Sequence, residues 1–467
     1  MRNARVRTYN ARMTRNLDQI TRSLRSVWHP CTQMKHHAAG ENSPFLPLIP
    51  IARGEGAWLI DFEGNRYLDA ISSWWTNLFG HANPRINAAL KKQLDTLEHT
   101  MLAGFTHEPV IELSERLSAL TGLGHAFYAS DGASANEIAL KMSFHFWRNH
   151  GRPEKRTFIS LTGGYHGETI GALSVTDVAI FRDAYGPLLA NHLLTPFPGS
   201  TGFMSDGSGQ SRSAQQAAAT LEQLLVEKHQ QIAALILEPL VQGAAGMRMY
   251  HADFLRHARA LCTRYDVHLI ADEIMTGFGR TGTLFAWDQV EAVKANQVNL
   301  PDFVCLSKGM TGGYLPLSCV LTTDDIYAAF YHDDTVRGFL HSHSYTGNAL
   351  ACRAALTVLD IFASDDVLAQ NRSKATRWTA MLGALAAHPR VQNFRHLGMI
   401  WAFEVEDIPL DFPRCFFSAA LKRGLLLRPI GNTVYLMPPY VVQDDEFKAM
   451  VEGIIAILDQ DLCKGSL

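Results

Sequence analysis

The chain contains the segment Phe303-Val-Cys-Leu-Ser307-Lys308-Gly309, in which a short apolar run ends at a lysine between small residues. Such a run is typical of a buried strand. A charge at the end of a buried strand is costly unless it has a task. Burial can remove the charge of Lys308 and make it a nucleophile that forms an imine with an aldehyde cofactor. The alternative is a lysine that reaches solvent along its own stem.

Other short apolar runs predict further strands at Thr157–Leu161, Ile232–Leu237, Val267–Ala271 and Leu317–Thr322. Helical patterns separate many of these runs, so the sequence predicts an α/β fold with a mainly parallel central sheet and helices on both faces. One helix is expected after Pro84, and another from a capping box, Ser134-x-x-Glu137. The Gly- and Ser-rich stretch Pro196–Ser213 is expected to be a surface loop.

A second strand also ends in acidic residues, in Leu269-Ile-Ala-Asp272-Glu273. In a parallel α/β sheet the carboxyl ends of the strands line the ligand crevice. An aspartate there can hold a cationic group, such as a protonated pyridine nitrogen. A helix cap or a structural ion pair is the alternative for Asp272 alone. With Lys308 at the end of another strand, the functional interpretation is favoured.

Two glycine-rich loops complete the candidate site. Ser130-Asp-Gly132-Ala133-Ser134 leads into a helix, whose free N–H groups and dipole suit a phosphate, although capped helices are common. The segment Gly163-Gly-Tyr165-His166-Gly167 follows a predicted strand. The ring of Tyr165 can stack on a planar cofactor. His166 is either a base or a turn residue packed beside that ring.

Composition excludes several function classes. The chain has 467 residues, 47% of them hydrophobic, and a net charge of -3. No apolar run reaches the roughly 18 residues of a membrane span, and no basic footprint indicates a nucleic-acid partner. Its 7 scattered cysteines predict mostly reduced thiols in a cytoplasmic protein. The histidines show no H-E-x-x-H spacing, so no metal is expected.

The first 25 residues are rich in arginine and poor in acids. We expect residues 1–25 to be a disordered tail, or an over-extended start before Met13, in preference to an organellar transit peptide. The remaining chain is predicted to form a large cofactor-binding α/β domain over residues 75–344. A smaller α+β domain is expected from residues 26–74 and 345–467.

The motifs occur in the order Asp131-Gly-Ala-Ser-Ala-Asn-Glu137, Gly164-Tyr-His-Gly167, Asp272-Glu273, Gly277-Phe-Gly-Arg280-Thr-Gly282 and Ser307-Lys308-Gly309. In this order and spacing they resemble the class III (ω-type) aminotransferases of fold type I, and the resemblance covers essentially the whole chain after about residue 25. It implies an enzyme that uses pyridoxal 5′-phosphate and small-molecule substrates. A non-catalytic binding protein with the same fold is the contrasting hypothesis.

The resemblance also implies roles for individual residues. Lys308 would carry the cofactor as a Schiff base and later move the substrate proton. Asp272 would pair with the pyridine nitrogen, Tyr165 would stack on the ring, and the backbone of Gly132 and Ala133 would bind the phosphate.

A homodimer with composite sites is implied too. The other subunit would complete the phosphate site from the segment His341-Ser342-His343-Ser344, in which the Ser344 hydroxyl stands where a threonine is usual. His343 is included among the cofactor-binding candidates.

Further segments resemble one group within the family, namely Trp28-His-Pro30, Ser72-Ser-Trp74-Trp75, Val241–Tyr250, Arg428-Pro429 and Tyr435–Pro439. That group moves an amino group from S-adenosylmethionine to 7-keto-8-aminononanoate in biotin biosynthesis. Lysine as the donor, or a different ω-aminotransferase activity, are the alternatives.

For this substrate, Trp74 would supply a flat apolar surface, with Trp75 as a further candidate, and Arg428 would grip the carboxylate. Arg280 would be a second contact or only a support for the Asp272 strand. Cys31 and Ser342 would lie around the pocket with Tyr165 and Lys308. Four positions depart from the group: Cys31 replaces a tyrosine, Glu168 replaces an aspartate, and Ser342-His343 replaces Gly-Pro.

Overall fold

The structure, a computed structural model, describes residues 14–37, 47–199, 208–290 and 299–460. Its centre is a sheet in the order β4-β12-β11-β10-β7-β5-β6. The strands are β4 (His125–Ala129), β5 (Thr157–Leu161), β6 (Leu193–Thr195), β7 (Ile232–Leu237), β10 (His268–Asp272), β11 (Phe303–Leu306) and β12 (Ser318–Thr322). All neighbours are parallel except β12, which is antiparallel to β11 and β4. The predicted mainly parallel α/β sheet is confirmed.

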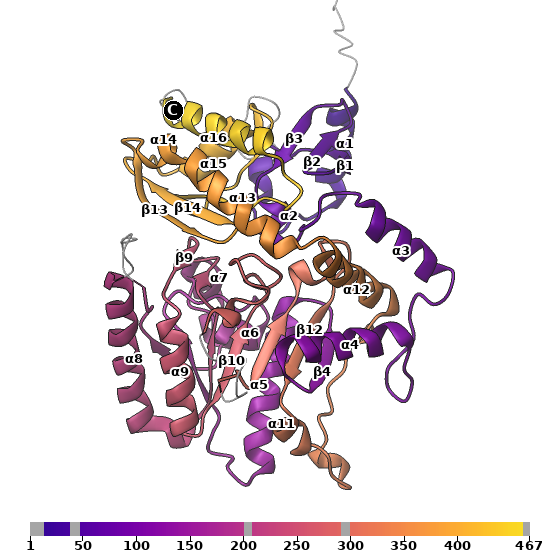
Figure 1. The fold of residues 1–467 in the computed structure, drawn as a ribbon, viewed down its shortest axis with the longest axis vertical. Coiled ribbons are helices and arrows are strands. Elements are labelled where there is room, and N and C mark those ends of the chain that lie inside the picture. Colours follow the sequence, from indigo (N-terminus) through magenta and orange to yellow (C-terminus); the bar gives the residue numbers. More distant parts are fainter. Residues whose placement is uncertain (1–13, 38–46, 200–207, 291–298, 461–467) are drawn as a thin grey trace, which may run out of the picture.

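Side chains on these strands alternate between two apolar clusters, one on each face of the sheet. On one face Ile236 packs in the same cluster as Ile138 of α5 (Gly132–Asn149). On the other face Leu235 lies in a cluster with Leu221 of α8 (Ser208–Lys228) and Phe254 of α9 (Asp253–Arg264). Helices therefore cover both faces (Figure 1), as a buried parallel sheet requires.

Two smaller sheets lie in the upper part of Figure 1. One has the order β1-β2-β3-β15, with β1 (Ile51–Glu55), β2 (Trp58–Asp61), β3 (Arg66–Asp69) and β15 (Leu425–Leu426). The other has the order β13-β14-β16, with β13 (Val391–Leu397), β14 (Ile400–Val405) and β16 (Thr433–Leu436). Because β15 pairs with β3, the early and late parts of the chain share one sheet. The domain boundaries at residues 75 and 345 stay a prediction.

The remaining elements connect or cover these sheets. The helices are α1 (Arg15–Ser26), α2 (Ser72–Trp75), α3 (Pro84–Leu94), α4 (Glu108–Thr121), α6 (Ile170–Ser174), α7 (Ala179–Arg182), α11 (Asp324–Ala328), α12 (Ala349–Ser364), α13 (Val367–Met381), α14 (Gly383–Ala386), α15 (Phe412–Leu421) and α16 (Asp444–Leu458). A short hairpin joins β8 (Val241–Gln242) to β9 (Arg248–Met249). None of the helices in the described ranges is long and apolar enough to cross a membrane.

Three local predictions differ from the structure. The expected disordered tail contains helix α1, which begins after the N-cap Thr14. A hydrogen bond from Asn16 Nδ2 to Asp61 Oδ2 (2.9 Å) ties this helix to β2. Residues 1–13 lie outside the described ranges. The expected loop Pro196–Ser213 gives way to α8 from Ser208. Helix α5 is capped by Asp131, because its carboxylate accepts the N–H of Ser134.

The predicted capping partner Glu137 instead accepts bonds from Thr169, Gly171 and Ala172, and so fastens α6 to α5.

Most cysteines are reduced, as expected. Cys262, Cys305, Cys319 and Cys352 are free and buried, and Cys31 is free and exposed. Cys415, in contrast, is disulfide-bonded.

Candidate active site

A cavity of about 520 Å³ opens where β5, β7, β10 and β11 end. It is lined by Trp75, Thr76, Ser130, Asp131, Gly132, Ala133, Tyr165, His166, Gly167, Glu168, Glu238, Asp272, Ile274, Met275, Ser307, Lys308, Thr311, Gly313, Tyr314, Leu315, Pro316 and Leu317. The strand-end positions singled out from the sequence therefore meet in one place, because parallel strands bring their carboxyl ends to the same edge of the sheet.

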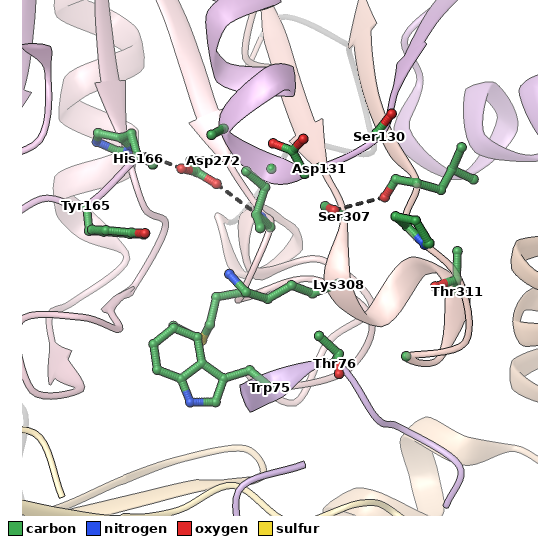
Figure 2. A pocket seen from close by; sticks show the side chains of 18 of the residues that line it. Trp75, Thr76, Ser130, Asp131, Tyr165, His166, Asp272, Ser307, Lys308 and Thr311 are labelled. Carbon is green, nitrogen blue, oxygen red and sulfur yellow. Dashed lines mark hydrogen bonds and ion pairs between the residues drawn. The ribbon is translucent and has the colours of Figure 1, made fainter. Parts of the chain in front are cut away.

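Lys308 lines this cavity. It follows β11 after Ser307, whose hydroxyl donates to the carbonyl of Leu317 (2.8 Å). Figure 2 shows its amino group between the ring of Trp75 and the carboxylate of Asp272, and the Nζ atom is 5.2 Å from the centre of the Trp75 ring. Burial lowers the pKa of Lys308, while Asp272 and Glu238 act to raise it. A lysine with a lowered pKa is a better nucleophile near neutral pH.

Asp272 ends β10 and is held in a fixed orientation. Its Oδ2 atom accepts bonds from His166 Nδ1 and Asn136 Nδ2, both at 2.8 Å. The Oδ1 atom accepts the N–H of Ile274 at 3.2 Å. His166 is thus neither a free base nor a mere turn residue, since its ring donates to the carboxylate that lines the cavity (Figure 2).

The first turn of α5 forms another wall of the cavity. Asp131 caps the N–H of Ser134, and its carbonyl accepts the N–H of Ala135. The N–H groups of Gly132 and Ala133 precede these bonds, and no acceptor is assigned to them within the described part of the chain. Together with the helix dipole they suit a phosphate.

Tyr165 and Glu168 form a further part of the cavity wall. The Tyr165 hydroxyl donates to Glu168 Oε1 at 2.9 Å. Burial and then the neighbouring Glu168 raise the pKa of Tyr165 above its ordinary value, so the phenol stays protonated. Cys31 lies near Glu168 and Arg428. Partial burial and Glu168 raise the pKa of its thiol, whereas Arg428 acts to lower it.

The two neighbouring tryptophans contact different charged groups. Trp75 lines the cavity, whereas a substrate contact of Trp74 stays a prediction. Trp74 is 44% exposed and its ring lies 5.0 Å from the guanidinium carbon of Arg428. Arg428 also donates from Nη2 to the carbonyl of Cys31 at 3.4 Å. Both aromatic rings therefore contact a basic residue, but only one faces the cavity.

Arg280 does not reach the cavity. It is 1% exposed, and its guanidinium donates to the carbonyls of Pro438 (2.9 Å) and Asn77 (3.1 Å). Of the two roles predicted for Arg280, these bonds favour support over a substrate contact, because both terminal nitrogens bind backbone carbonyls. Its role is to connect the loop after β10 to two other segments of the chain.

The segment 341–344 also lies away from this chain's own cavity. The rings of His341 and His343 are joined through their Nε2 atoms at 2.9 Å, and Lys141 Nζ lies 2.7 Å from His341 Nδ1. The carbonyl of Ser344 accepts from His99 at 2.9 Å. His343, Ser344 and Ser342 remain predictions that require a second subunit.

The sequence interpretation missed Glu238, which also lines the cavity. It is 5% exposed, and its two carboxylate oxygens accept the N–H groups of Tyr165 (3.0 Å) and Gly243 (2.9 Å). Burial raises its pKa to about 7, with His166 opposing and Asp272 adding to the effect. The signal was present, because Glu238 directly follows the apolar run Ile232–Leu237 just as Asp272 follows its own.

These residues fit pyridoxal phosphate. The donor set comprises an amine with a lowered pKa, a carboxylate held by two hydrogen bonds, an aromatic side chain and the first turn of a helix. An imine, a pyridinium nitrogen, a flat ring and a phosphate dianion need these four kinds of group. Across the described ranges, no group of three or more His, Cys, Asp or Glu side chains is placed to hold a metal ion.

Comparisons with known proteins agree with this geometry. The model of the Aminotransferase class-III family matches residues 38–458. The adenosylmethionine-8-amino-7-oxononanoate aminotransferase of Helicobacter pylori is 46% identical, over 94% of this chain and 97% of that protein. The protein of the same name from Geobacter sulfurreducens is 39% identical, over 92% and 95%.

Solved structures are similar over the same length. The adenosylmethionine-8-amino-7-oxononanoate aminotransferase of Methanocaldococcus jannaschii superposes with a TM-score of 0.86 at 34% identity, over 94% of this chain and 98% of that chain. A PLP-bound amine transaminase from an uncultivated Pseudomonas species gives a TM-score of 0.83 at 32% identity, over 93% and 98%.

Proposed function

Because this chain belongs to the class III aminotransferases, we propose that it transfers an amino group from S-adenosylmethionine to 7-keto-8-aminononanoate. The product is 7,8-diaminononanoate, an intermediate of biotin biosynthesis. Family membership makes the chain a pyridoxal-phosphate-dependent aminotransferase. The choice of donor and acceptor is the proposal, and it is supported by the names of relatives up to 46% identical and by the two ends of the site.

The reacting end is built from Lys308, Asp272 and Tyr165. Pyridoxal phosphate, when bound, draws electrons from the substrate carbon and stores the amino group between the two half-reactions. Lys308 holds the cofactor and then moves a proton at the substrate carbon, which its lowered pKa assists. Asp272, fixed by His166 and Asn136, keeps a proton on the pyridine nitrogen. Tyr165 covers the ring, and Gly132 and Ala133 bind the phosphate.

The other end is built from Arg428 and the neighbouring Trp74 and Trp75. This end supports the proposed acceptor. Trp75 faces Lys308 and Trp74 faces Arg428. One pair of neighbouring rings thus extends from the reacting amine to a guanidinium. A keto acid with an apolar chain and a terminal carboxylate matches this order of groups, since guanidinium binds carboxylate in a bidentate manner.

The enzyme is proposed to work as a cytoplasmic homodimer with composite sites. Ser344, His343 and Ser342 do not line the cavity of their own chain, so a contact with phosphate or substrate would be made in the site of the partner subunit. The exposed apolar side chains of this region, Val336, Leu340 and Tyr345, support such an interface.

Separate half-reactions test the function. The purified protein, loaded with pyridoxal phosphate, is mixed with S-adenosylmethionine or with lysine, and loss of the visible cofactor band identifies the donor. The aminated enzyme is then mixed with 7-keto-8-aminononanoate, which should restore the band. Restoration only by another keto acid or aldehyde would instead assign a different ω-aminotransferase activity, and loss of the band with lysine alone would change the donor.

A further inference from the structure

Four consecutive residues of α2 have a left-handed backbone. The φ angles of Ser72, Ser73, Trp74 and Trp75 are 53°, 46°, 70° and 74°. The N–H of Trp75 donates to the carbonyl of Ile71 (2.9 Å), so the segment is a closed left-handed turn. Non-glycine residues adopt this conformation singly and at a cost, because Cβ approaches the following carbonyl. A run of four persists only where the surroundings hold it.

Asp69, at the end of β3, is the first of these surroundings. It is fully buried. Its Oδ1 atom accepts the N–H groups of Ser73 (2.9 Å) and Ile71 (3.3 Å), and Oδ2 accepts the Ser73 hydroxyl (2.7 Å). His81 Nε2 lies 3.1 Å from Oδ2, and its Nδ1 lies 3.1 Å from the amide of Asn77. One carboxylate thereby binds the turn at three points and is itself oriented by a histidine.

The C-terminal segment holds the other side of the turn. The Ser72 hydroxyl donates to the carbonyl of Met437 (2.8 Å), and the Trp75 indole donates to the Tyr435 hydroxyl (3.0 Å). Gly243 leaves room for the Trp75 ring, since a Cβ there would lie 3.3 Å from it. The turn is therefore clamped between β3, the segment 435–437 and the hairpin of β8 and β9.

The clamped turn determines where two charged groups are presented. Trp75 lies under the amino group of Lys308, and Trp74 lies under the guanidinium of Arg428. Because the two tryptophans are consecutive and their backbone is held, the shape of the turn sets where the two rings lie relative to each other beneath the amine and the guanidinium. In an extended backbone, consecutive side chains would point to opposite faces.

We infer that Asp69 is a positioning residue that, by holding this left-handed turn through Ser73, sets the acceptor length that the enzyme prefers. The inference rests on the proposed function and deepens it. The substrate class is a keto acid whose carboxylate is a fixed number of bonds from the carbonyl. A shorter or longer acid cannot place both ends while the turn keeps its shape.

The test compares the holoenzyme with Asp69→Asn, Ser73→Ala and Ser73→Gly. Acceptors are keto acids of increasing chain length and one ketone without a carboxylate. We expect the ratio of kcat/KM between the best acid and one two methylenes shorter to fall roughly tenfold in Asp69→Asn, mainly through KM. The rate with the carboxylate-free ketone and the visible cofactor band should stay as in the parent enzyme.

The serine pair separates positioning from stability. Both variants lose the hydroxyl that binds Asp69, but glycine adopts a positive φ easily and alanine does not. Ser73→Gly should therefore unfold at a higher temperature than Ser73→Ala, while both lose length preference. Asp61→Asn is the matched control, because Asp61 is a buried aspartate of the same sheet that binds a turn through Asn65 and Glu63. It should keep the preference.

An unchanged length preference in both Asp69→Asn and Ser73→Gly would overturn the inference, as would an equal loss in Asp61→Asn. Failure of the proposed function is a separate outcome, namely no turnover of 7-keto-8-aminononanoate by the parent enzyme. The preference among the other acids is measured in either case. Quenching of tryptophan fluorescence by each acid gives the same ranking without turnover.

Discussion

At the scale of single residues, the site depends on how burial changes the charge of Lys308. Its amino group lies between an aromatic ring and a fixed carboxylate, and burial lowers its pKa. Asp272 opposes that shift, so the lysine keeps a basicity suited to both imine formation and proton transfer. Removal of the Asp272 carboxylate should thus lower the pKa of Lys308 further.

Replacement of Lys308 by alanine should abolish the borohydride-reducible visible band of the holoenzyme. We expect the rate of amino transfer to fall by on the order of a thousandfold or more, because the nucleophile and the proton carrier are lost together. Absorption spectra before and after reduction measure the band. Lys155→Gln is the matched control: this lysine is also buried, with a pKa lowered to about 8, but it binds the carbonyls of His229 and Ile232. Persistence of the band in Lys308→Ala would contradict the assignment.

Glu238 gives a prediction about pH. Burial raises its pKa from 4.5 to about 7, so between these values the folded protein binds this proton more tightly than the unfolded chain does. The free energy of unfolding should therefore decrease as the pH rises from 4.5 toward 7. The contribution of one such group is at most about 1.4 kcal/mol per pH unit.

Urea denaturation of the cofactor-free protein at pH 5, 6 and 7 measures this slope. Glu238→Gln should be less pH-dependent than the parent protein, whereas Glu55→Gln, which alters an exposed carboxylate, should not differ. Glu273 also has a pKa raised to about 7, but it is present in every variant, so the difference between slopes belongs to Glu238. Equal slopes for Glu238→Gln and the parent would refute the prediction.

At the scale of the element, the first turn of α5 lies close to the strand ends because its residues are small. Its backbone N–H groups are therefore presented to the cavity. A Cβ at Gly132 would lie 2.9 Å from two carbon atoms of Ile274. In Gly132→Ala, the first turn of α5 must therefore shift, and the N–H groups of residues 132 and 133 move with it. We expect the affinity for pyridoxal phosphate to fall roughly tenfold, equivalent to about 1.4 kcal/mol.

Fluorescence titration of the cofactor-free protein with pyridoxal phosphate measures this affinity. Gly383→Ala is the control, because a Cβ at that helical position meets nothing within 4 Å. Wild-type affinity in Gly132→Ala would show that the phosphate lies elsewhere.

At the scale of the whole molecule, a composite site predicts complementation between subunits. Lys308→Ala and Ser344→Asp should each be inactive as homodimers, the second because a carboxylate would repel the cofactor phosphate. In a mixed dimer, one site combines Lys308 from one chain with Ser344 from the other. Refolding an equimolar mixture should yield about a quarter of the parent activity, since half of the dimers are mixed and each has one intact site. Absence of any recovery would mean that the site lies within one chain.

Much of this arrangement follows from sequence alone. Strands β5, β7 and β11 begin and end where the apolar runs predict, because a strand buried on both faces is made mostly of apolar residues. The meeting of Lys308, Asp272, Tyr165 and Gly132 follows in turn, since parallel strands deliver their ends to one edge. Glu238 obeys the same rule, since it directly follows β7.

Only the tertiary structure decided which tryptophan faces the cavity and what Arg280 does. Local pattern could not assign these roles, because they depend on a left-handed turn held by Asp69 and by residues more than 350 positions away, such as Tyr435 and Met437. Contacts between distant segments have no local signature. The sequence by itself thus determined the sheet, the chemistry at its edge and the family. The packing of the C-terminal segment against that edge decided how the substrate end is arranged.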